Sequence, residues 1–435
     1  MFEKFQNIFR IPELKRRILF TLALLVVYRL GGHVPTPGVN SDALVTAFAG
    51  QANSLFGLYD LFVGGSFAKA TVFALGIMPY ISVSIIFQLL GAVIPYFEKL
   101  QKEGEEGRKK ITQYTRVGTV ALAAAQSFAF ARFLESLGSA GAPVVPEPGM
   151  GFRLMTMITQ TAGTILIMWL GEQITERGIG NGISLIIFIG IVARFPADMI
   201  NSYRALKVGT MTPVVAALMV ILIVLVIAAV VAITQAQRKI PVQYAKRVVG
   251  RKMYGGQSTH IPLRVNTAGV IPIIFAQSLI MLPSTLALYF HGSNAIQTIA
   301  GWFSHGTIIY IVVYSLTIVF FTYFYTAIVL NPTDMADNMK KYGGFIPGIR
   351  PGRKTSEYID RILSRITLPG AIFLAIIAVL PDILIRKFNV PFYFGGTSTL
   401  IVVGVALDTL QQVESHLLMR HYEGIMRTGR MRGRR

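Results

Sequence analysis

The sequence predicts an all-α membrane protein that crosses the bilayer with ten helices. About ten apolar segments follow one another along the 435 residues, of which 53% are hydrophobic and only 14% are charged. The loops between these segments alternate between strongly basic and nearly uncharged, and the basic loops of membrane proteins remain in the cytoplasm. A soluble domain of this length would carry more charge, so we expect lipid around most of the chain.

The spans are placed by length, because a helix needs ~20 apolar residues to cross the hydrocarbon. We expect them at 18–36, 71–95, 117–136, 154–171, 183–200, 212–233, 269–290, 307–330, 367–386 and 392–413. With this order, 32 of the 41 Lys and Arg residues fall on the cytoplasmic side and 7 in outer loops. The first 17 residues carry five of them, and no small-residue cleavage signal follows the first span. We therefore expect a cytoplasmic N-terminus and a basic cytoplasmic tail at 414–435.

Ten spans divide into an N-terminal half, 1–205, and a C-terminal half, 206–413. Five spans in each half make the second half cross the membrane in the opposite sense to the first, as in inverted repeats. The two halves show no visible sequence similarity that would prove the repeat.

Two predicted cytoplasmic loops, 234–268 and 331–366, are long and basic. One interpretation is that they only fix the topology and touch anionic lipid. The other is that they dock a large anionic partner such as a ribosome, through contacts that weaken with salt. In the second loop, prolines and glycines surround Arg350 and present it on a partly rigid turn. This presentation suits binding of a carboxylate or phosphate, and a hydrogen bond within the loop is the alternative.

The segment from Leu55 to Gly65 is apolar at most positions but has only about half the length needed to cross the bilayer. It is either a re-entrant segment or an amphipathic helix on the outer surface. Non-helical backbone at membrane depth, such as that expected at Gly64 and Gly65, needs protein or a water-filled cavity around it. A re-entrant segment would therefore imply a cavity within the bundle.

Isoleucines recur at a spacing of four in two of the predicted spans, at Ile77, Ile81 and Ile85 and again at Ile183, Ile187 and Ile191. Each set lies on one face of its helix. Stiff β-branched side chains that converge can form a narrow constriction that excludes water and ions. The same spacing is common on faces turned to lipid, so spacing alone does not decide between the two.

Composition argues against catalysis. The chain has no cysteine and six scattered histidines, which leaves no thiol nucleophile and no cluster of metal ligands. No GxSxG motif and no pair of aspartates within the membrane is present, so we expect neither an enzyme nor a cofactor. A secondary transporter is the main alternative, but transporters usually place charged groups at mid-membrane, where these spans have almost none.

Six longer motifs, spread over the whole chain, closely resemble the bacterial SecY family of protein-conducting channels. They are Gly76–Ser82, Gly171–Ser184, Tyr244–Arg247, Gln257–Arg264, Phe345–Gly352 and Pro391–Thr397. The resemblance implies two inverted five-span halves around a central hourglass pore, with a lateral opening to lipid between spans 2 and 7. It also implies the function: translocating unfolded secretory polypeptides and releasing hydrophobic segments sideways into the bilayer.

Site residues follow from the resemblance, residue by residue. It implies a pore ring at Ile77, Ile81, Ile187, Ile191, Ile274 and Ile401. It places a lateral gate at Ser82 and Leu282. A plug at about 55–67 would include Leu55, Phe56, Leu58, Tyr59, Leu61 and Phe62. Docking of the motor ATPase SecA or of the ribosome would involve Arg247, Arg251, Lys252 and Arg350.

The resemblance further implies two small membrane partners, SecE and SecG, and preproteins that carry signal sequences as substrates. The expected location is the cell (plasma or inner) membrane. The energy for transport would come from SecA or the ribosome, because this chain shows no catalytic motif.

Overall fold

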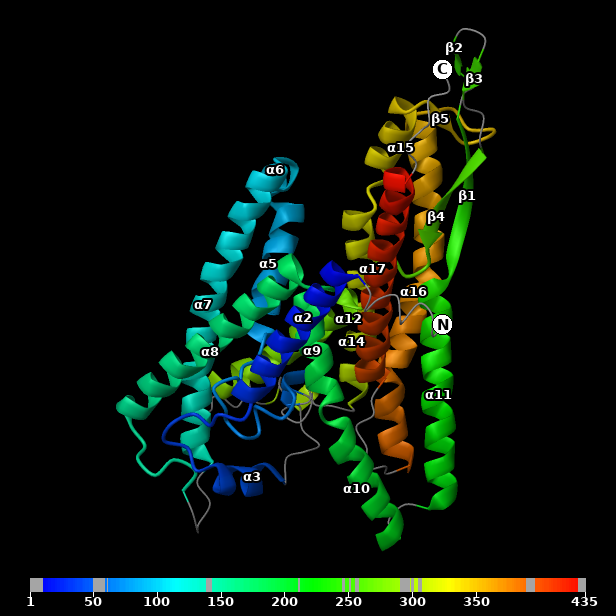
Figure 1. Cartoon of the computed structure of the whole chain (residues 1–435). Coiled ribbons are helices and arrows are strands. Elements are labelled where there is room, and N and C mark those ends of the chain that lie inside the picture. Colours follow the sequence, from blue (N-terminus) through cyan, green and yellow to red (C-terminus); the bar gives the residue numbers. More distant parts are fainter. Residues whose placement is uncertain are drawn as a thin grey trace. The chain divides into compact units, whose positions relative to one another are not determined.

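The computed structural model is mostly helical and describes residues 11–49, 59–60, 62–137, 143–209, 212–244, 247–249, 252–254, 258–289, 298, 301–303, 307–388 and 396–428. These residues fall into two compact units (Figure 1). Unit 1 comprises Met1–Asn201, Ser278–His305 and Val405–Arg435, and unit 2 comprises Ser202–Gln277 and Gly306–Gly404. The boundary between the units falls within helices α10, α12 and α17, whose residues are divided between them, and once between His305 and Gly306.

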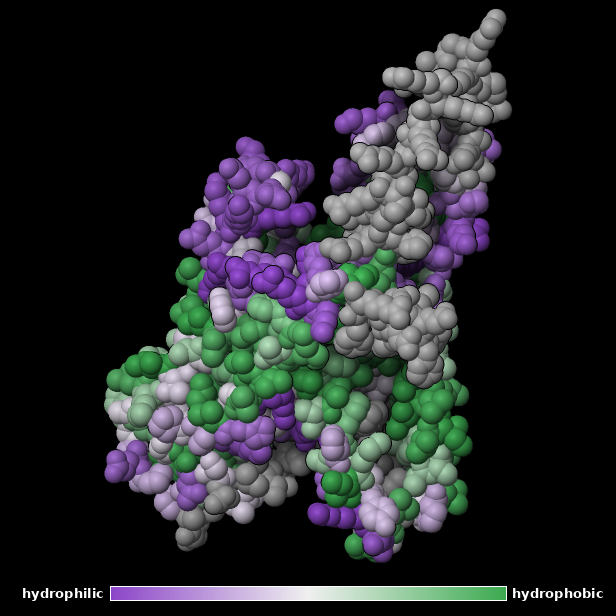
Figure 2. Space-filling model, viewed as in Figure 1, coloured by the Kyte–Doolittle hydropathy of each residue, from purple (hydrophilic) through white to green (hydrophobic). Residues whose placement is uncertain are grey.

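Unit 1 is built from helices. Those that lie wholly within it are α2 (Pro12–Gly31), α3 (Ser41–Ala49), α5 (Met78–Val93), α6 (Pro95–Lys102), α7 (Glu105–Ser136), α8 (Met150–Arg177) and α9 (Gly182–Val192). The long helices α7 and α8 lie side by side, and α8 also packs against α2 and α9. Figure 2 shows hydrophobic side chains across the middle of α7 and α8, where Val117, Leu154, Ile158 and Leu166 are exposed. Lipid is the natural neighbour of such a surface.

Unit 2 combines helices with two small sheets. Its helices are α11 (Pro213–Gln235), α14 (Ile308–Val329), α15 (Pro332–Lys341) and α16 (Arg353–Phe388). Its strands are β1 (Gln237–Tyr244), β2 (Arg247–Val249), β3 (Lys252–Tyr254), β4 (Ser258–Arg264) and β5 (Gly344–Phe345). One sheet has the strand order β4-β1-β5 and the other pairs β2 with β3. The expectation of an all-α fold was therefore wrong for the region between α11 and α16.

Three helices have residues in both units: α10 (Phe195–Val208), α12 (Ile271–Tyr289) and α17 (Gly396–Thr428). In unit 2, Phe275 of α12 packs edge-on against Phe321 of α14, with ring centroids 5.7 Å apart. In unit 1, α17 approaches the junction of α8 and α9, where Gln412 accepts a hydrogen bond from the Gly180 N–H at 3.0 Å.

A helix lies at each of the ten predicted spans. Among the described residues, six helices are long and apolar enough to cross a membrane, and a seventh is the pair α5 and α6 if its 99° bend lies within one span. The predicted spans at α2, α12 and α17 do not meet that criterion. α2 carries basic residues at both ends, and the apolar part of α12 is short.

The predicted start of the second span, at 71, was wrong by seven residues, because α5 begins at Met78. Residues 72–77 form turns instead. Both Gly76 and Ala70 have positive φ, at 55° and 42°, a conformation that interrupts a right-handed helix. The turns are nevertheless buried, since Phe73, Leu75 and Ile77 are all less than 5% exposed.

The glycine-rich junction at 178–182 sets the start of α9. The Asn181 side chain caps this helix by accepting hydrogen bonds from the N–H groups of Ile183 and Ser184. A Cβ at Gly182 would collide with the carbonyl oxygen of Gly171, so the residue type is fixed by close packing of the two helices. The Ile179 N–H donates to the Thr21 hydroxyl of α2 at 3.1 Å. α9 therefore has a well-defined position within unit 1.

Candidate functional site

The re-entrant segment, which we define as residues 59–77, folds back onto unit 1. Of the predicted plug residues, Tyr59 and Phe62 are described, whereas Leu55, Phe56, Leu58 and Leu61 lie outside the described residues. Phe62 is buried, at 4% exposure. The Tyr59 hydroxyl donates a hydrogen bond to the Leu75 carbonyl at 2.8 Å and closes the segment into a loop. Phe62 is therefore packed within the fold rather than exposed at its surface.

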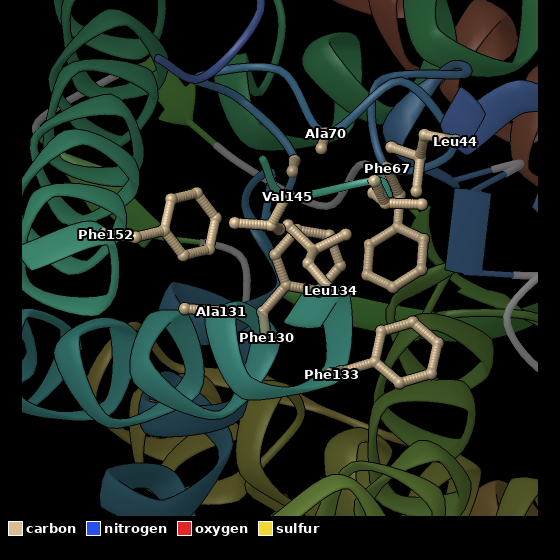
Figure 3. Packing of buried hydrophobic residues seen from close by; sticks show 11 residues of the cluster. Leu44, Phe67, Ala70, Phe130, Ala131, Phe133, Leu134, Val145 and Phe152 are labelled. Carbon is tan, nitrogen blue, oxygen red and sulfur yellow. The ribbon is translucent and has the colours of Figure 1, made fainter. Parts of the chain in front are cut away.

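The base of the re-entrant segment is anchored by apolar packing. Phe67 lies between two aromatic rings, with centroids 4.9 Å from Tyr59 and 4.7 Å from Phe130 of α7. Figure 3 shows Phe67 and Phe130 within a larger cluster of buried side chains. The cluster joins α3, the re-entrant segment, α7 and α8 through Leu44, Phe67, Ala70, Ala74, Phe130, Ala131, Phe133, Leu134, Val144, Val145 and Phe152.

The same base is also tied to the chain that follows α2. The Val72 N–H donates to the Val34 carbonyl and the Thr36 N–H to the Ala70 carbonyl, both at 2.9 Å. These two hydrogen bonds flank an isolated antiparallel bridge between Pro35 and Thr71. Backbone pairing of this kind satisfies polar groups that would otherwise be costly to bury.

The tip of the re-entrant segment carries a buried acid. Asp60 is 8% exposed, and its two carboxylate oxygens accept hydrogen bonds from the Ala68 N–H and from Arg194, each at 2.9 Å. Burial raises the pKa of Asp60, and the Ala68 N–H and Arg194 act in the opposite direction.

The six isoleucines that the family resemblance selects are all buried. Ile77 immediately precedes α5 and Ile81 lies one turn further along it, with exposures of 4% and 3%. Ile187 and Ile191 are one turn apart on α9, at 1% and 2%. Ile274 of α12 and Ile401 of α17 belong to unit 2 and are exposed by 5% and 0%. None of the six lies on the exposed surface that lipid would cover.

Helices α5 and α12, the predicted spans 2 and 7, touch within unit 1. The Ser278 hydroxyl lies 3.8 Å from the Met78 sulfur, and both residues are buried. Met78 and Ser278 are one helical turn before Ser82 and Leu282, the two predicted gate residues. Ser82 is half-buried on α5, and the side chain of Leu282 lies outside the described residues. Pro283 within α12 removes a backbone hydrogen bond next to this position and favours a bend there.

The two predicted basic loops fold together in unit 2 into one body, which we call the hairpin module: β1, β4, β5, α15 and the first turns of α16. β1 and β4 pair in antiparallel register from Gln237 opposite Arg264 to Gln243 opposite Ser258. β5 continues the sheet by pairing Gln243 with Phe345. A small core fills the module, made of Ile240, Val242, Leu263, Met339, Ile346, Ile359 and Leu363.

The hairpin module positions Arg350 at the surface. This residue is exposed and lies just before α16, where its carbonyl accepts a hydrogen bond from the Thr355 hydroxyl at 2.9 Å. Arg247 and Lys252 lie on the short strands β2 and β3, their side chains are outside the described residues, and all of Arg251 is outside. The expected loop 331–366 is thus mostly regular structure, since α16 already begins at Arg353.

Sequence reasoning missed three features of this site: the hairpin, the Asp60 to Arg194 pair, and the contact between Met78 and Ser278. The hairpin had a signal, because Ile240 and Val242 alternate with polar residues and prolines, as do Ile261 and Leu263. The other two features had no signal in the sequence, because the residues that meet are 134 and 200 positions apart. Within the described part of the chain, no group of three or more His, Asp or Glu residues is placed to hold a metal ion.

Comparison with known proteins gives a consistent set of relatives. The SecY family model matches residues 71–410 of the chain. The protein translocase subunit SecY of Aquifex aeolicus is 48% identical over 98% of this chain and 100% of its own length. The subunit of the same name from Escherichia coli K12 is 45% identical over 97% of this chain and 96% of its own length.

Solved structures share the fold at low sequence identity. A structure of a protein-conducting channel aligns with a TM-score of 0.65 and 17% identity, over 92% of this chain and 91% of the other. A second structure describes how the plug domain of SecY stabilises the closed channel and maintains a membrane seal. It aligns with a TM-score of 0.61 and 18% identity, over 92% of this chain and 91% of the other. Canine Sec61 from a ribosome-channel complex aligns with a TM-score of 0.61 and 17% identity, over 92% of this chain and 91% of the other.

Proposed function

This chain belongs to the SecY family, and we propose that it forms a channel through which unfolded secretory polypeptides cross the membrane. The chain is not an enzyme; the energy for transport comes from a partner. The observation that carries the proposal is the re-entrant segment, whose base is packed on α7 and paired with residues 34–36, while its tip is buried. A segment that enters the bundle without crossing it suits a seal for a resting channel.

In this proposal the chain crosses the plasma or inner membrane ten times, as two inverted halves, 1–205 and 206–413, around an hourglass pore, with both termini in the cytoplasm. Ile77, Ile81, Ile187, Ile191, Ile274 and Ile401 form the ring, and their complete burial within the fold supports this role. An aliphatic ring excludes ions by dewetting and binds no passing side chain tightly. The plug, Leu55 to Phe67, closes the ring from the outside.

The lateral gate lies between α5 and α12, near Ser82 and Leu282. The contact of Met78 with Ser278 supports this placement, because it joins the two helices one turn away through a weak hydrogen bond to sulfur. A sufficiently hydrophobic signal sequence opens the gate by binding the open state better than the closed one, and it then enters lipid.

The hairpin module and the β1–β4 connection that carries β2 and β3 dock the ribosome or SecA. The module contributes Arg350, and the connection contributes Arg247, Arg251 and Lys252. SecE and SecG complete the complex. The rigid, basic and exposed character of the module supports docking over a role in topology alone. Contacts of Lys and Arg with ribosomal RNA predict binding that weakens steeply as salt rises.

Reconstitution tests the proposed function. The chain is placed in proteoliposomes with SecE and SecG, and SecA, ATP and a signal-bearing preprotein are added outside. We expect preprotein to become protected from protease only when the signal is intact. A preprotein with a charged residue within the apolar part of its signal serves as the control. Uptake of small solutes without any protection of preprotein would contradict the proposal and favour a transporter.

A further inference from the structure

Two arginines, one in α2 and one in the turn after α9, hold the tip of the re-entrant segment. Arg194, which follows α9, donates to Asp60 with 2.9 Å between its Nη1 and the Asp60 Oδ2. Arg29, in the last turn of α2, donates from its Nη1 to the Gly64 carbonyl at 3.2 Å. The tip is thereby connected by charged groups to both α2 and the end of α9.

Backbone contact brings α9 and the tip close enough for these bonds. Gly64 has φ +72°, and a Cβ there would lie 2.9 Å from both the Arg29 Nη1 and the Gly190 Cα. A Cβ at Gly190 would lie 2.9 Å from the Phe62 carbonyl oxygen. Neither position has room for a side chain, so the tip rests directly on the α9 backbone.

The two ends of the re-entrant segment are held by different forces. The base depends on apolar packing around Phe67, which persists when water approaches. The tip has two buried apolar side chains, Phe62 and Val63, and in addition a charge pair whose side chains are 11% and 32% exposed. Such a pair is strong while it is shielded and weakens sharply when water raises the local dielectric constant.

We propose that Asp60, Arg194 and Arg29 form a latch that positions the plug in the closed channel, and that opening breaks the bond between Asp60 and Arg194. The latch rests on the proposed function, because a closed state has meaning only for a channel. Once it is released, Arg194 retains a second acidic neighbour, Asp198, one turn along the chain. Arg194 therefore still has a negatively charged neighbour in the open state.

The absence of native cysteine allows a direct test. Val63→Cys places a single thiol in the tip, at a position that is 2% exposed. A membrane-impermeant maleimide added from the outer side modifies this thiol only when the tip leaves its site. The assay uses the full chain in proteoliposomes with SecE and SecG.

Arg194→Gln removes the charge pair, and Arg194→Lys keeps it with a poorer geometry. Arg153→Gln is the matched control, because Arg153 pairs with Glu135 at 2.8 Å and with the same side-chain exposures, 32% and 11%, and neither residue belongs to the tip. We expect Arg194→Gln to speed modification of the thiol about tenfold. This factor corresponds to the loss of ~1.4 kcal/mol of stabilisation from the half-buried pair. Arg153→Gln should leave the rate unchanged, and Arg194→Lys should restore it to within about threefold of the parent.

An unchanged rate in Arg194→Gln would overturn the latch, and so would an equal increase in Arg153→Gln. Preprotein protection is measured on the same vesicles. If the Val63→Cys parent protects preprotein but Arg194→Gln changes no rate, the latch is wrong and the channel stands. If the parent protects no preprotein with all partners present, the proposed function itself is wrong. The two failures are therefore distinguishable.

Discussion

The re-entrant segment and the hairpin module both lie between membrane helices, yet they are stabilised in opposite ways. The re-entrant segment has little regular structure among its described residues, and it is held by residues of other elements: Phe130, Arg29 and Arg194. The hairpin module has its own sheet and its own core. A segment that is held by contacts with other elements can move when those contacts change. A self-contained module stays rigid and suits the capture of a partner.

The largest expected effect concerns the base of the re-entrant segment. Phe67→Ala removes a ring that is 3% exposed and contacts Tyr59 and Phe130, which should cost about 3–5 kcal/mol of stability. We expect a lower melting temperature in detergent and a raised ion leak, with ribosome binding unchanged. Phe320→Ala, at a ring that is 56% exposed on α14, is the control and should change little. Loss of ribosome binding in Phe67→Ala would contradict the independence of the two regions.

Ile240→Ala tests whether damage to the hairpin module leaves the re-entrant segment unchanged. Its side chain is 2% exposed in the core of the hairpin module, and truncation should cost about 2–5 kcal/mol. We expect hydrogen exchange to accelerate in β1 and β4 and docking to weaken, with the ion leak at the parent level. Faster exchange in residues 62–77 to the same degree would show that the module is not self-contained.

Arg350→Ala should leave the fold intact, because the side chain is exposed. If Arg350 binds an anionic group of SecA or the ribosome, its loss should weaken docking about tenfold or more, in line with roughly 1.5–3 kcal/mol for a hydrogen bond to a charged group. Arg353→Ala removes a neighbouring arginine that is 91% exposed and serves as the matched control. Equal losses from the two changes would indicate a general charge effect rather than recognition by Arg350.

The smallest effect is expected at Glu357, near the start of α16. A hydrogen bond from Lys354, aided by Arg353, lowers the pKa of this exposed carboxyl. A lowered pKa means that the stabilisation is present at neutral pH and is lost as the pH falls through that pKa. Glu357→Gln should slightly reduce exchange protection in the first turns of α16 at neutral pH. At a pH below this lowered pKa, where the parent carboxyl is itself protonated, variant and parent should coincide; a persistent difference there would exclude the ion pair as its cause.

The sequence predicted the parts of the fold that depend on local pattern and missed those that depend on distant partners. Each predicted span overlaps a helix, because an apolar stretch of sufficient length has few alternatives in lipid. Among the described residues, six of these helices, or seven with the bent pair α5 and α6, are long and apolar enough to cross a membrane. The start of α5 was placed too early because the turns at 72–77 are as apolar as a helix. Residues 70–72, at the start of these turns, pair with residues 34–36, and the pattern of the segment itself does not reveal this pairing.

For the candidate site, the isoleucine spacing indicated which residues share a helix face, but only the family resemblance selected them as a ring. The alternation at Ile240 and Val242 was sufficient to predict a strand, and the high charge of the surrounding loop obscured it. The pair of Asp60 and Arg194 joins residues 134 positions apart, so it follows only from the folded structure.

One measurement tests the channel most directly. A photo-crosslinking residue at Ile81 or Ile187 is presented to a stalled, signal-bearing nascent chain, with Val220 on α11, 62% exposed, as the lipid-facing control. The account predicts capture of the nascent chain at Ile81 and Ile187 and none at Val220. Capture at Val220 alone, with no product at either isoleucine, would contradict it.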